Sequence, residues 1–124
     1  MQTLNGAGTL PASVLFPGVK VRVLEGDRLT LAIAELDPNI TVAQHRHHNE
    51  QLGVVAQGSA TFIVDGETKE LTAGGTYRLL SNVPHEVRVG PEGAVFIECF
   101  SPVRDDWHAL VPDPDLISSW PSAR

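Results

Sequence analysis

Residues 39–58 read NITVAQHRHHNEQLGVVAQG, and this stretch indicates both the fold and the chemistry of the chain. Side chains alternate between two faces along a β-strand, so His45 and His47 would direct both rings to the same face. Another histidine, His85, follows Pro84 much later in the sequence. Because imidazole is the commonest transition-metal ligand at neutral pH, the pattern predicts a metal site built on β-structure.

Alternation of apolar and polar residues continues along most of the chain and predicts short strands separated by turns. The strand candidates are residues 19–23, 29–36, 51–57, 59–65, 67–72, 75–80, 85–89 and 93–100. Asp65-Gly66 suits a tight hairpin turn, and strands spaced by about 8–12 residues are typical of an all-β sandwich or barrel. The tail from Asp105 onward is expected to hold one or two short helical turns.

A length of 124 residues suits one domain with one sizeable core, so we expect residues 1–124 to form a single unit. Residues 1–12 are small and polar and are expected to be loose, with the barrel core at about residues 13–101. The apolar segment 14–18 has two interpretations. It is either a strand that covers the barrel of its own subunit or part of a dimer interface.

Composition excludes several classes of partner. The formal net charge is −6 and no basic stripe stands out, so a nucleic-acid partner is not expected. Cys99 is the only cysteine, which rules out an intramolecular disulfide and suits a reducing compartment. The N-terminal residues lack the features of a signal peptide, and no apolar run is long enough for a membrane span. We therefore expect a soluble cytoplasmic protein without a membrane partner.

Three histidines and one oxygen donor would complete a four-ligand site for a divalent transition metal. Such a set suits Zn, Ni, Fe or Mn, and open coordination positions would accept substrate or water. Gln51 is the favoured oxygen donor and Glu50 is its rival, since a bulge before the strand would exchange their directions. An amide ligand leaves more positive charge on the metal, which favours a small anionic substrate. The alternative is a set of satisfied polar residues on a barrel face without a metal.

A second group of candidate residues lies on and after the last predicted strand. Glu98 and Phe100 share one face of that strand, and Arg104 follows it. A carboxylate inside the barrel would be a candidate general acid or base, and a guanidinium could clamp a substrate carboxylate. The alternative places Glu98 on the solvent face and Arg104 in a surface ion pair. Gly53 and Tyr77 are assigned structural roles only.

The spacing around the histidines resembles cupin motif 1, Gly-x5-His-x-His-x3/4-Glu-x6-Gly. Three residues are in register with that motif: His45, His47 and Gly58. Gln51 stands at the Glu position and Asn39 replaces the first Gly. Gly74 and His85 match cupin motif 2, Gly-x5-Pro-x-Gly-x2-His-x3-Asn. The resemblance implies a double-stranded β-helix, the jelly-roll barrel of the cupins, with the metal inside.

A narrower likeness spans nearly the whole chain. The segments HRHHNEQLGVVAQGSATFIVDGE, NVPHEV and ECFSPVRDD resemble small cupins of the pectin-degradation type, which open unsaturated uronates to linear keto acids. The likeness implies four metal ligands: His45, His47, Gln51 and His85. It also implies pocket residues at Glu98, where the family pattern has Asp, and at Phe100 and Arg104.

The expected function is therefore a metal-dependent isomerase or lyase-like reaction on a carboxylated sugar or keto acid. In it Glu98 would move the proton, Arg104 would clamp the anion and Phe100 would form an apolar wall. One alternative is another metal-cupin enzyme, such as a dioxygenase or a cyclase. A second is a cupin that binds a small ligand without catalysis. A homodimer is expected, since small cupins commonly pair through barrel faces.

Overall fold

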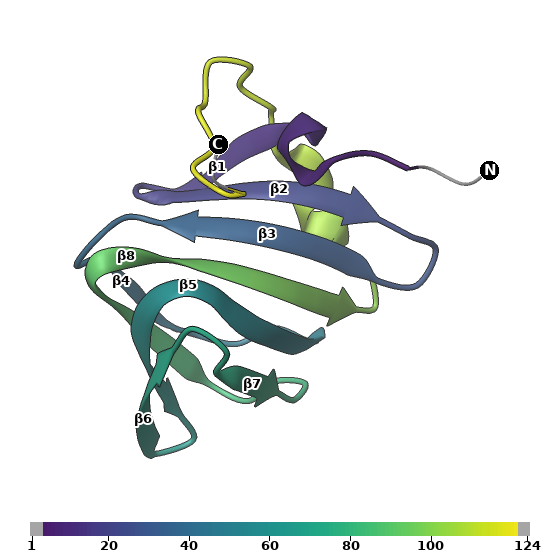
Figure 1. Cartoon of the computed structure of the whole chain (residues 1–124). Coiled ribbons are helices and arrows are strands. Elements are labelled where there is room, and N and C mark those ends of the chain that lie inside the picture. The colour runs from purple at the N-terminus through teal and green to yellow at the C-terminus, as the bar shows by residue number, and fades with distance from the viewer. Residues whose placement is uncertain (1–3, 122–124) are drawn as a thin grey trace.

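Two long antiparallel strands, β5 (Glu50–Val64) and β8 (His85–Ser101), run through the centre of the molecule and take part in both of its sheets (Figure 1). The computed structural model describes residues 4–121. The other elements are η1 (Ala7–Thr9), β1 (Ala12–Phe16), β2 (Val19–Glu25), β3 (Thr30–Leu36), β4 (Thr41–His45), β6 (Glu67–Thr72), β7 (Thr76–Leu79) and η2 (Asp105–Ala109).

All strand pairs are antiparallel, and together they form one eight-stranded sheet that folds within β5 and β8 into two smaller sheets. The first half of β5 and the second half of β8 lie in a sheet ordered β1-β2-β3-β8-β5-β7. The other halves lie in a sheet ordered β4-β8-β5-β6. This arrangement confirms the predicted all-β jelly-roll barrel. It brings the end of β4 beside the start of β8, where His45 pairs in register with His85.

The turn residues in the middle of β5 and β8 bend these strands instead of ending them. The predicted pairs of strands, 51–57 with 59–65 and 85–89 with 93–100, are each one continuous strand, so the sequence-based breaks are wrong. The register shifts at Gly58, which has a φ of +79°. A Cβ on Gly58 would lie 2.0 Å from the carbonyl oxygen of Gly93, so only glycine permits this crossing.

Two strands, β1 and β4, lie outside the ranges predicted from alternation, although one interpretation of segment 14–18 expected β1 as a covering strand. Strand β4 is short, with three exposed residues at its end, and β1 is an edge strand that pairs with β2 of the same chain. The segment 14–18 therefore contributes a covering strand to its own barrel, although Val14 and Phe16 remain 50% and 44% exposed. Of the segment expected to be loose, residues 7–9 form a 3-10 turn and Ala12 begins β1, while residues 1–3 lie outside the described part.

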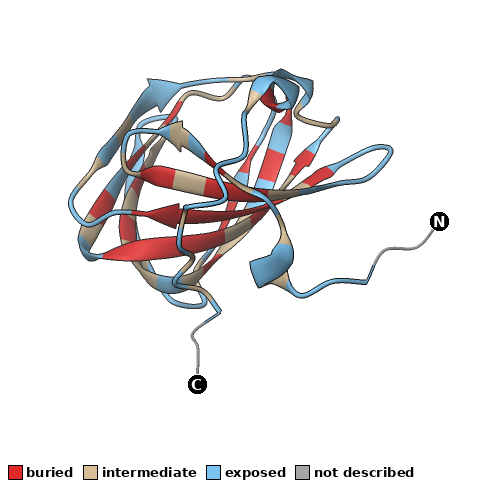
Figure 2. Cartoon of the chain, turned by 90° about the horizontal axis from the view of Figure 1, so that it is seen from above, coloured by how far each residue is buried: buried red, intermediate tan, exposed pale blue. Residues whose placement is uncertain are grey.

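The core fills the space between the two sheets, where the inward faces of the strands are buried (Figure 2). A smaller cluster closes one end of the barrel and consists of Ala32, Phe100 and Trp107. Trp107 lies in η2, the short helical turn predicted for the tail. Within residues 4–121, the helices are too short to cross a membrane.

A buried ion pair fastens both ends of the chain to the outer face of β2 and β3. Arg22 donates to Glu35 over 3.3 Å, and the two side chains are only 2% and 8% exposed. Arg22 also donates to the backbone carbonyls of Ala7 and Trp120, and Ser119 donates to Glu35. These bonds hold the C-terminal tail against the barrel.

Candidate metal centre

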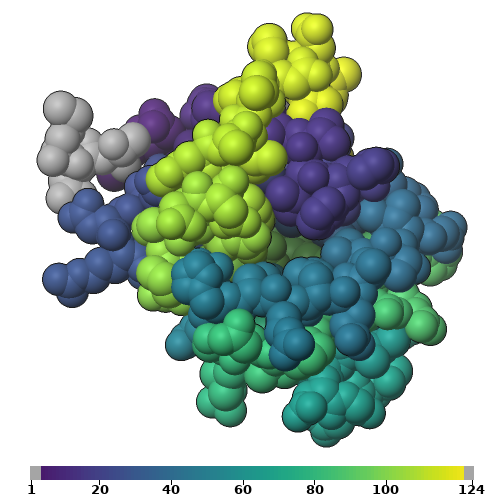
Figure 3. Space-filling model, turned by 180° about the vertical axis from the view of Figure 1, so that it is seen from behind, coloured from purple at the N-terminus to yellow at the C-terminus, as the bar shows by residue number. Residues whose placement is uncertain are grey.

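A cavity of about 100 Å³ enters the barrel between β1, the segment after β4 and the C-terminal segment. Figure 3 shows a hollow between the purple, blue and yellow-green parts of the chain that carry these elements. Its volume exceeds the roughly 15 Å³ that one water molecule needs, so a small ligand fits. Its lining includes His45, His47, His85, Gln51, Glu98, Phe100, Arg104 and Trp107.

The structure brings His45, His47 and His85 together, with one ligand atom of each within 4.8 Å of the others. His45 ends β4 and pairs in register with His85, which begins β8. His47 lies two residues beyond β4, in the loop before β5, so the expected strand geometry for the His-x-His pair is wrong. The loop returns its ring to within 5.0 Å of the His85 ring, measured between centroids.

The same kind of hydrogen bond, from Nδ1 to a backbone carbonyl, orients each of the three imidazole rings. The Nδ1 atoms of His45, His47 and His85 each lie 2.9 Å from a backbone carbonyl, of Ala43, Asn49 and Val83 respectively. A carbonyl only accepts, so Nδ1 carries the proton in each ring and Nε2 presents its lone pair. Hydrogen bonds of this kind commonly orient metal-binding histidines.

Two observations show that these lone pairs fit a cation. The Nε2 atom of His85 is buried and has no hydrogen-bond partner among the described residues. The Nε2 atom of His47 lies 3.1 Å from Oε1 of Gln51, which is also an acceptor. The Gln51 amide is fixed in that direction because its Nε2 donates to Glu98 over 2.8 Å. Two acceptors in contact are unfavourable unless a positive ion attracts both.

The rival oxygen donor is turned away from the cavity. Gln51 is buried, whereas Glu50 is exposed. His48 is exposed and belongs neither to the histidine cluster nor to the lining of the cavity. Gln51 is therefore the oxygen donor that the structure places beside the histidines.

Burial favours the neutral form of His47 and His85. It lowers the pKa of His47, and it lowers the pKa of His85 from 6.5 to about 4. Metal binding needs the unprotonated imidazole, so these side chains are in the binding form at neutral pH without loss of a proton. The cluster can therefore hold a divalent transition metal through three imidazoles and one amide oxygen.

Glu98 points into the barrel and is 7% exposed, so the alternative that placed it on the solvent face is wrong. Its Oε1 atom accepts hydrogen bonds from Gln51, over 2.8 Å, and from the Tyr77 hydroxyl, over 2.5 Å. Burial raises the pKa of Glu98, while these bonds and the charge of Arg104 oppose the shift. The result is a carboxyl group suited to exchange a proton inside the cavity.

Arg104 lies at the mouth of the same cavity, where its guanidinium stacks over Phe100 and Trp107 at 4.8 and 4.3 Å from the ring centroids. The ion pair expected by the alternative interpretation is present, because Arg104 pairs with Asp106. Nε and Nη2 donate to the two carboxylate oxygens of Asp106 over 3.0 and 2.9 Å. The Nη1 group makes neither of these bonds.

Two residues at the site were not identified from the sequence. Tyr77 contacts Glu98, and Asn49 is 1% exposed and donates to the segment before Arg104. Alternation along β7 places Tyr77 on the inward face with Leu79, but no spacing rule links it to Glu98. The tail residue His108 is exposed and pairs with Glu25, away from the metal cluster.

Comparison with known proteins agrees with this geometry. The cupin domain family profile matches residues 32–100, which is more than half of the sequence. The chain belongs to the cupin family. The match runs from β3 to the end of β8 and so includes all four candidate ligands of this cupin.

One relative of this cupin is a pectin degradation protein. The chain is 30% identical over 99 residues to the pectin degradation protein KdgF of Dickeya dadantii (strain 3937), covering 78% of this chain and 90% of that one. Among solved structures, an RmlC-like cupin from Shewanella frigidimarina NCIMB 400 has a TM-score of 0.79 at 26% identity, covering 86% and 96% of the two chains. KdgF from Halomonas sp. has a TM-score of 0.72 at 24% identity, covering 77% and 88%, and supports the fold.

Proposed function

We propose that this cupin is a metal-dependent enzyme that opens an unsaturated uronate, or a related carboxylated sugar, to a linear keto acid. The observation that carries the proposal is that Glu98 and Arg104 line the same cavity as the histidine cluster. A proton-transfer group, an anion-binding group and a cation site thus converge on one small space. The 30% identity to a pectin degradation protein supports the choice of substrate class.

The metal would be held by His45, His47, His85 and Gln51, with Zn, Ni, Fe and Mn as the ions that suit this donor set. A divalent ion there would supply Lewis-acid polarisation of a substrate oxygen. The neutral amide of Gln51 leaves the positive charge of the site undiminished, which suits an anionic substrate.

The chain's own residues would bind the substrate and move the proton. Arg104 binds the carboxylate through the part of its guanidinium that Asp106 leaves free, and Phe100 excludes water from one side. Ring opening removes the proton of the anomeric hydroxyl and breaks the bond between the anomeric carbon and the ring oxygen, which leaves an aldehyde at the anomeric carbon and an enolate at the former ring oxygen. The enolate becomes a ketone when the neighbouring carbon accepts a proton. We assign to Glu98 the removal of the hydroxyl proton and the delivery of a proton to that carbon.

A homodimer and a cytoplasmic location remain predictions from the sequence. The exposed Val14 and Phe16 on the edge strand β1 are the surface that we propose for the dimer contact. Sedimentation of the untagged protein tests the dimer directly.

The experiment that tests the function follows unsaturated galacturonate by NMR in the presence of untagged, metal-loaded protein. We expect linear keto acid to form faster than without protein, and Glu98→Gln and Arg104→Met to lower the rate at least about 100-fold. Glu50→Gln is the matched control, because that exposed carboxylate adjoins Gln51 in sequence but not the cavity. Product formation no faster than in the protein-free sample rejects the proposed reaction.

A further inference from the structure

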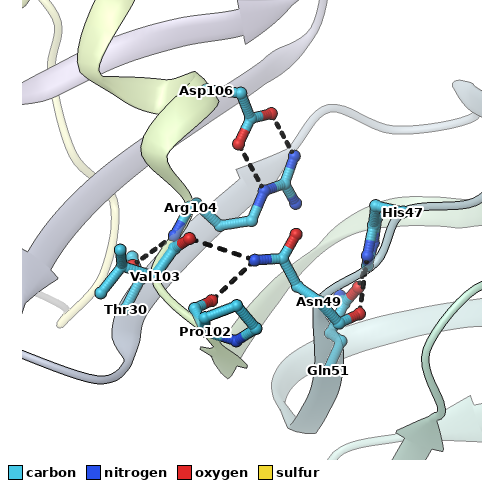
Figure 4. Close-up of polar contacts among 8 residues, drawn as sticks. All are labelled: Thr30, His47, Asn49, Gln51, Pro102, Val103, Arg104 and Asp106. Carbon is cyan, nitrogen blue, oxygen red and sulfur yellow. Dashed lines mark hydrogen bonds and ion pairs between the residues drawn. The ribbon is translucent and has the colours of Figure 1, made fainter.

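Asn49 is a buried polar residue that none of the proposed chemical steps uses. It is 1% exposed and lies between His47 and Gln51 in the sequence. Its Nδ2 group donates to two successive backbone carbonyls, of Pro102 over 2.6 Å and of Val103 over 3.2 Å (Figure 4). One amide group thus fastens the loop before β5 to the segment that follows β8.

The backbone of the same residue contacts the metal cluster. The carbonyl oxygen of Asn49 accepts the Nδ1–H of His47 over 2.9 Å, which directs Nε2 of that ring toward the other histidines. Figure 4 shows His47 on one side of Asn49 and the Pro102–Arg104 segment on the other. Asn49 is therefore in direct contact with one proposed metal ligand and with the residue before the proposed anion-binding arginine.

Further bonds hold Arg104 at this point. Its backbone N–H donates to the Thr30 hydroxyl over 2.9 Å, and its guanidinium is held by Asp106 from the exposed side. The backbone just before Arg104 is fixed by Asn49, since Val103 is its chain neighbour. Together these bonds determine where the free edge of the guanidinium lies relative to the histidines.

We infer that Asn49 is a positioning residue that sets the spacing between the metal cluster and the Arg104 guanidinium. The spacing selects substrates that carry a carboxylate at a fixed distance from a second oxygen donor. This inference rests on the proposed function for its substrate. Two linked oxygen-bearing groups gain affinity only if both of their sites are held at the matching distance.

The test separates the two contacts of Asn49. Asn49→Ala removes the side-chain amide but keeps the carbonyl that binds His47, so zinc affinity should stay within about threefold of the wild type. Affinity for D-galacturonate, measured by calorimetry on the zinc-loaded protein, should fall at least about tenfold. In the Arg104→Met background the same substitution should have no further effect, because Asn49 acts through Arg104.

A second measurement needs no substrate. The Nε–H resonance of Arg104 in zinc-loaded protein should exchange with water at least about tenfold faster in Asn49→Ala than in the wild type. Glu35→Gln is the control for general instability, because it disturbs a buried network on the outer face of the barrel and should leave this resonance unchanged.

The outcomes distinguish the two proposals. An unchanged Arg104 resonance in Asn49→Ala, or an equal loss of galacturonate affinity with and without Arg104, overturns the positioning role. If the Arg104 resonance responds but the wild-type protein neither binds galacturonate nor opens the unsaturated uronate, the uronate function is rejected and the positioning role is supported.

Discussion

The Tyr77 hydroxyl donates to the Glu98 carboxylate over 2.5 Å across the backbone of Gly53. Gly53 is paired in register with Tyr77 on β7 and with Glu98 on β8, so the three residues form one row across the sheet. A Cβ on Gly53 would lie 2.2 Å from Cζ of the Tyr77 ring. The missing side chain therefore provides the space in which tyrosine reaches the carboxylate.

Removal of the hydroxyl in Tyr77→Phe should lower the stability of the protein and raise the pKa of Glu98. A buried carboxylate that loses a donor is less well stabilised in its charged form, so the pKa of Glu98 should rise further. We expect the free energy of unfolding, measured in urea at neutral pH, to fall by about 1–2 kcal/mol. A variant that unfolds at the wild-type urea concentration would show that this bond contributes nothing.

Gly53→Ala should displace the Tyr77 ring and break the same bond by steric means. Overpacking of this kind costs about 1–3 kcal/mol, measurable as a lowered denaturation midpoint. Gly26→Ala is the control, since a Cβ there would find its nearest neighbour at 3.5 Å. If the two alanine variants are equally stable, the absence of a side chain at Gly53 is not what makes room for the Tyr77 ring.

The metal-free protein should lose stability in acid partly through His85. The pKa of this residue is lowered by burial from 6.5 to about 4 in the folded state. Below pH 6.5 the unfolded chain binds a proton that the folded chain does not, so stability falls as the pH falls toward 4. The free energy of unfolding, measured from pH 6.5 to pH 4, should fall less steeply in His85→Asn than in the wild type. An unchanged slope would show that protonation of His85 is not the cause of the acid sensitivity.

The Arg22–Glu35 pair should be sensitive to removal of one partner. Glu35→Gln leaves the Arg22 charge buried without its counterion, and we expect a loss of about 3 kcal/mol in urea unfolding. Glu86→Gln breaks the exposed pair with Arg88 and should cost less than about 1 kcal/mol. Similar losses for the two variants would mean that burial of the Arg22 pair has no energetic consequence.

Much of the architecture could be predicted because it depends on local patterns. Period-two alternation identifies β2, β3 and β6, and the histidine spacing identifies three cavity residues. The continuity of β5 and β8 could not be predicted, because Gly58 at a bend and a glycine at a strand end look the same in sequence. The reason for the glycine at position 58 is apparent only from the structure, where the backbone of Gly93 packs directly against it.

The arrangement of the site depended on contacts between distant residues. Alternation alone left the direction of Glu98 open, since both faces of β8 are largely apolar and only closure of the barrel defines the inside. Asn49 reaches Pro102 across 53 positions, and Tyr77 reaches Glu98 across 21, and neither spacing belongs to a local motif. His47 reaches the histidine cluster from a loop, whose path follows from tertiary packing rather than strand periodicity.

The most direct test of the central claim is elemental analysis of untagged protein after metal loading, repeated on His47→Ala and His85→Ala. We expect one transition-metal ion per chain in the wild type and a large loss in both variants, because each removes one of the converging imidazole nitrogens. A wild-type protein that holds less than about a tenth of an equivalent after loading, or variants that retain the wild-type content, would contradict it.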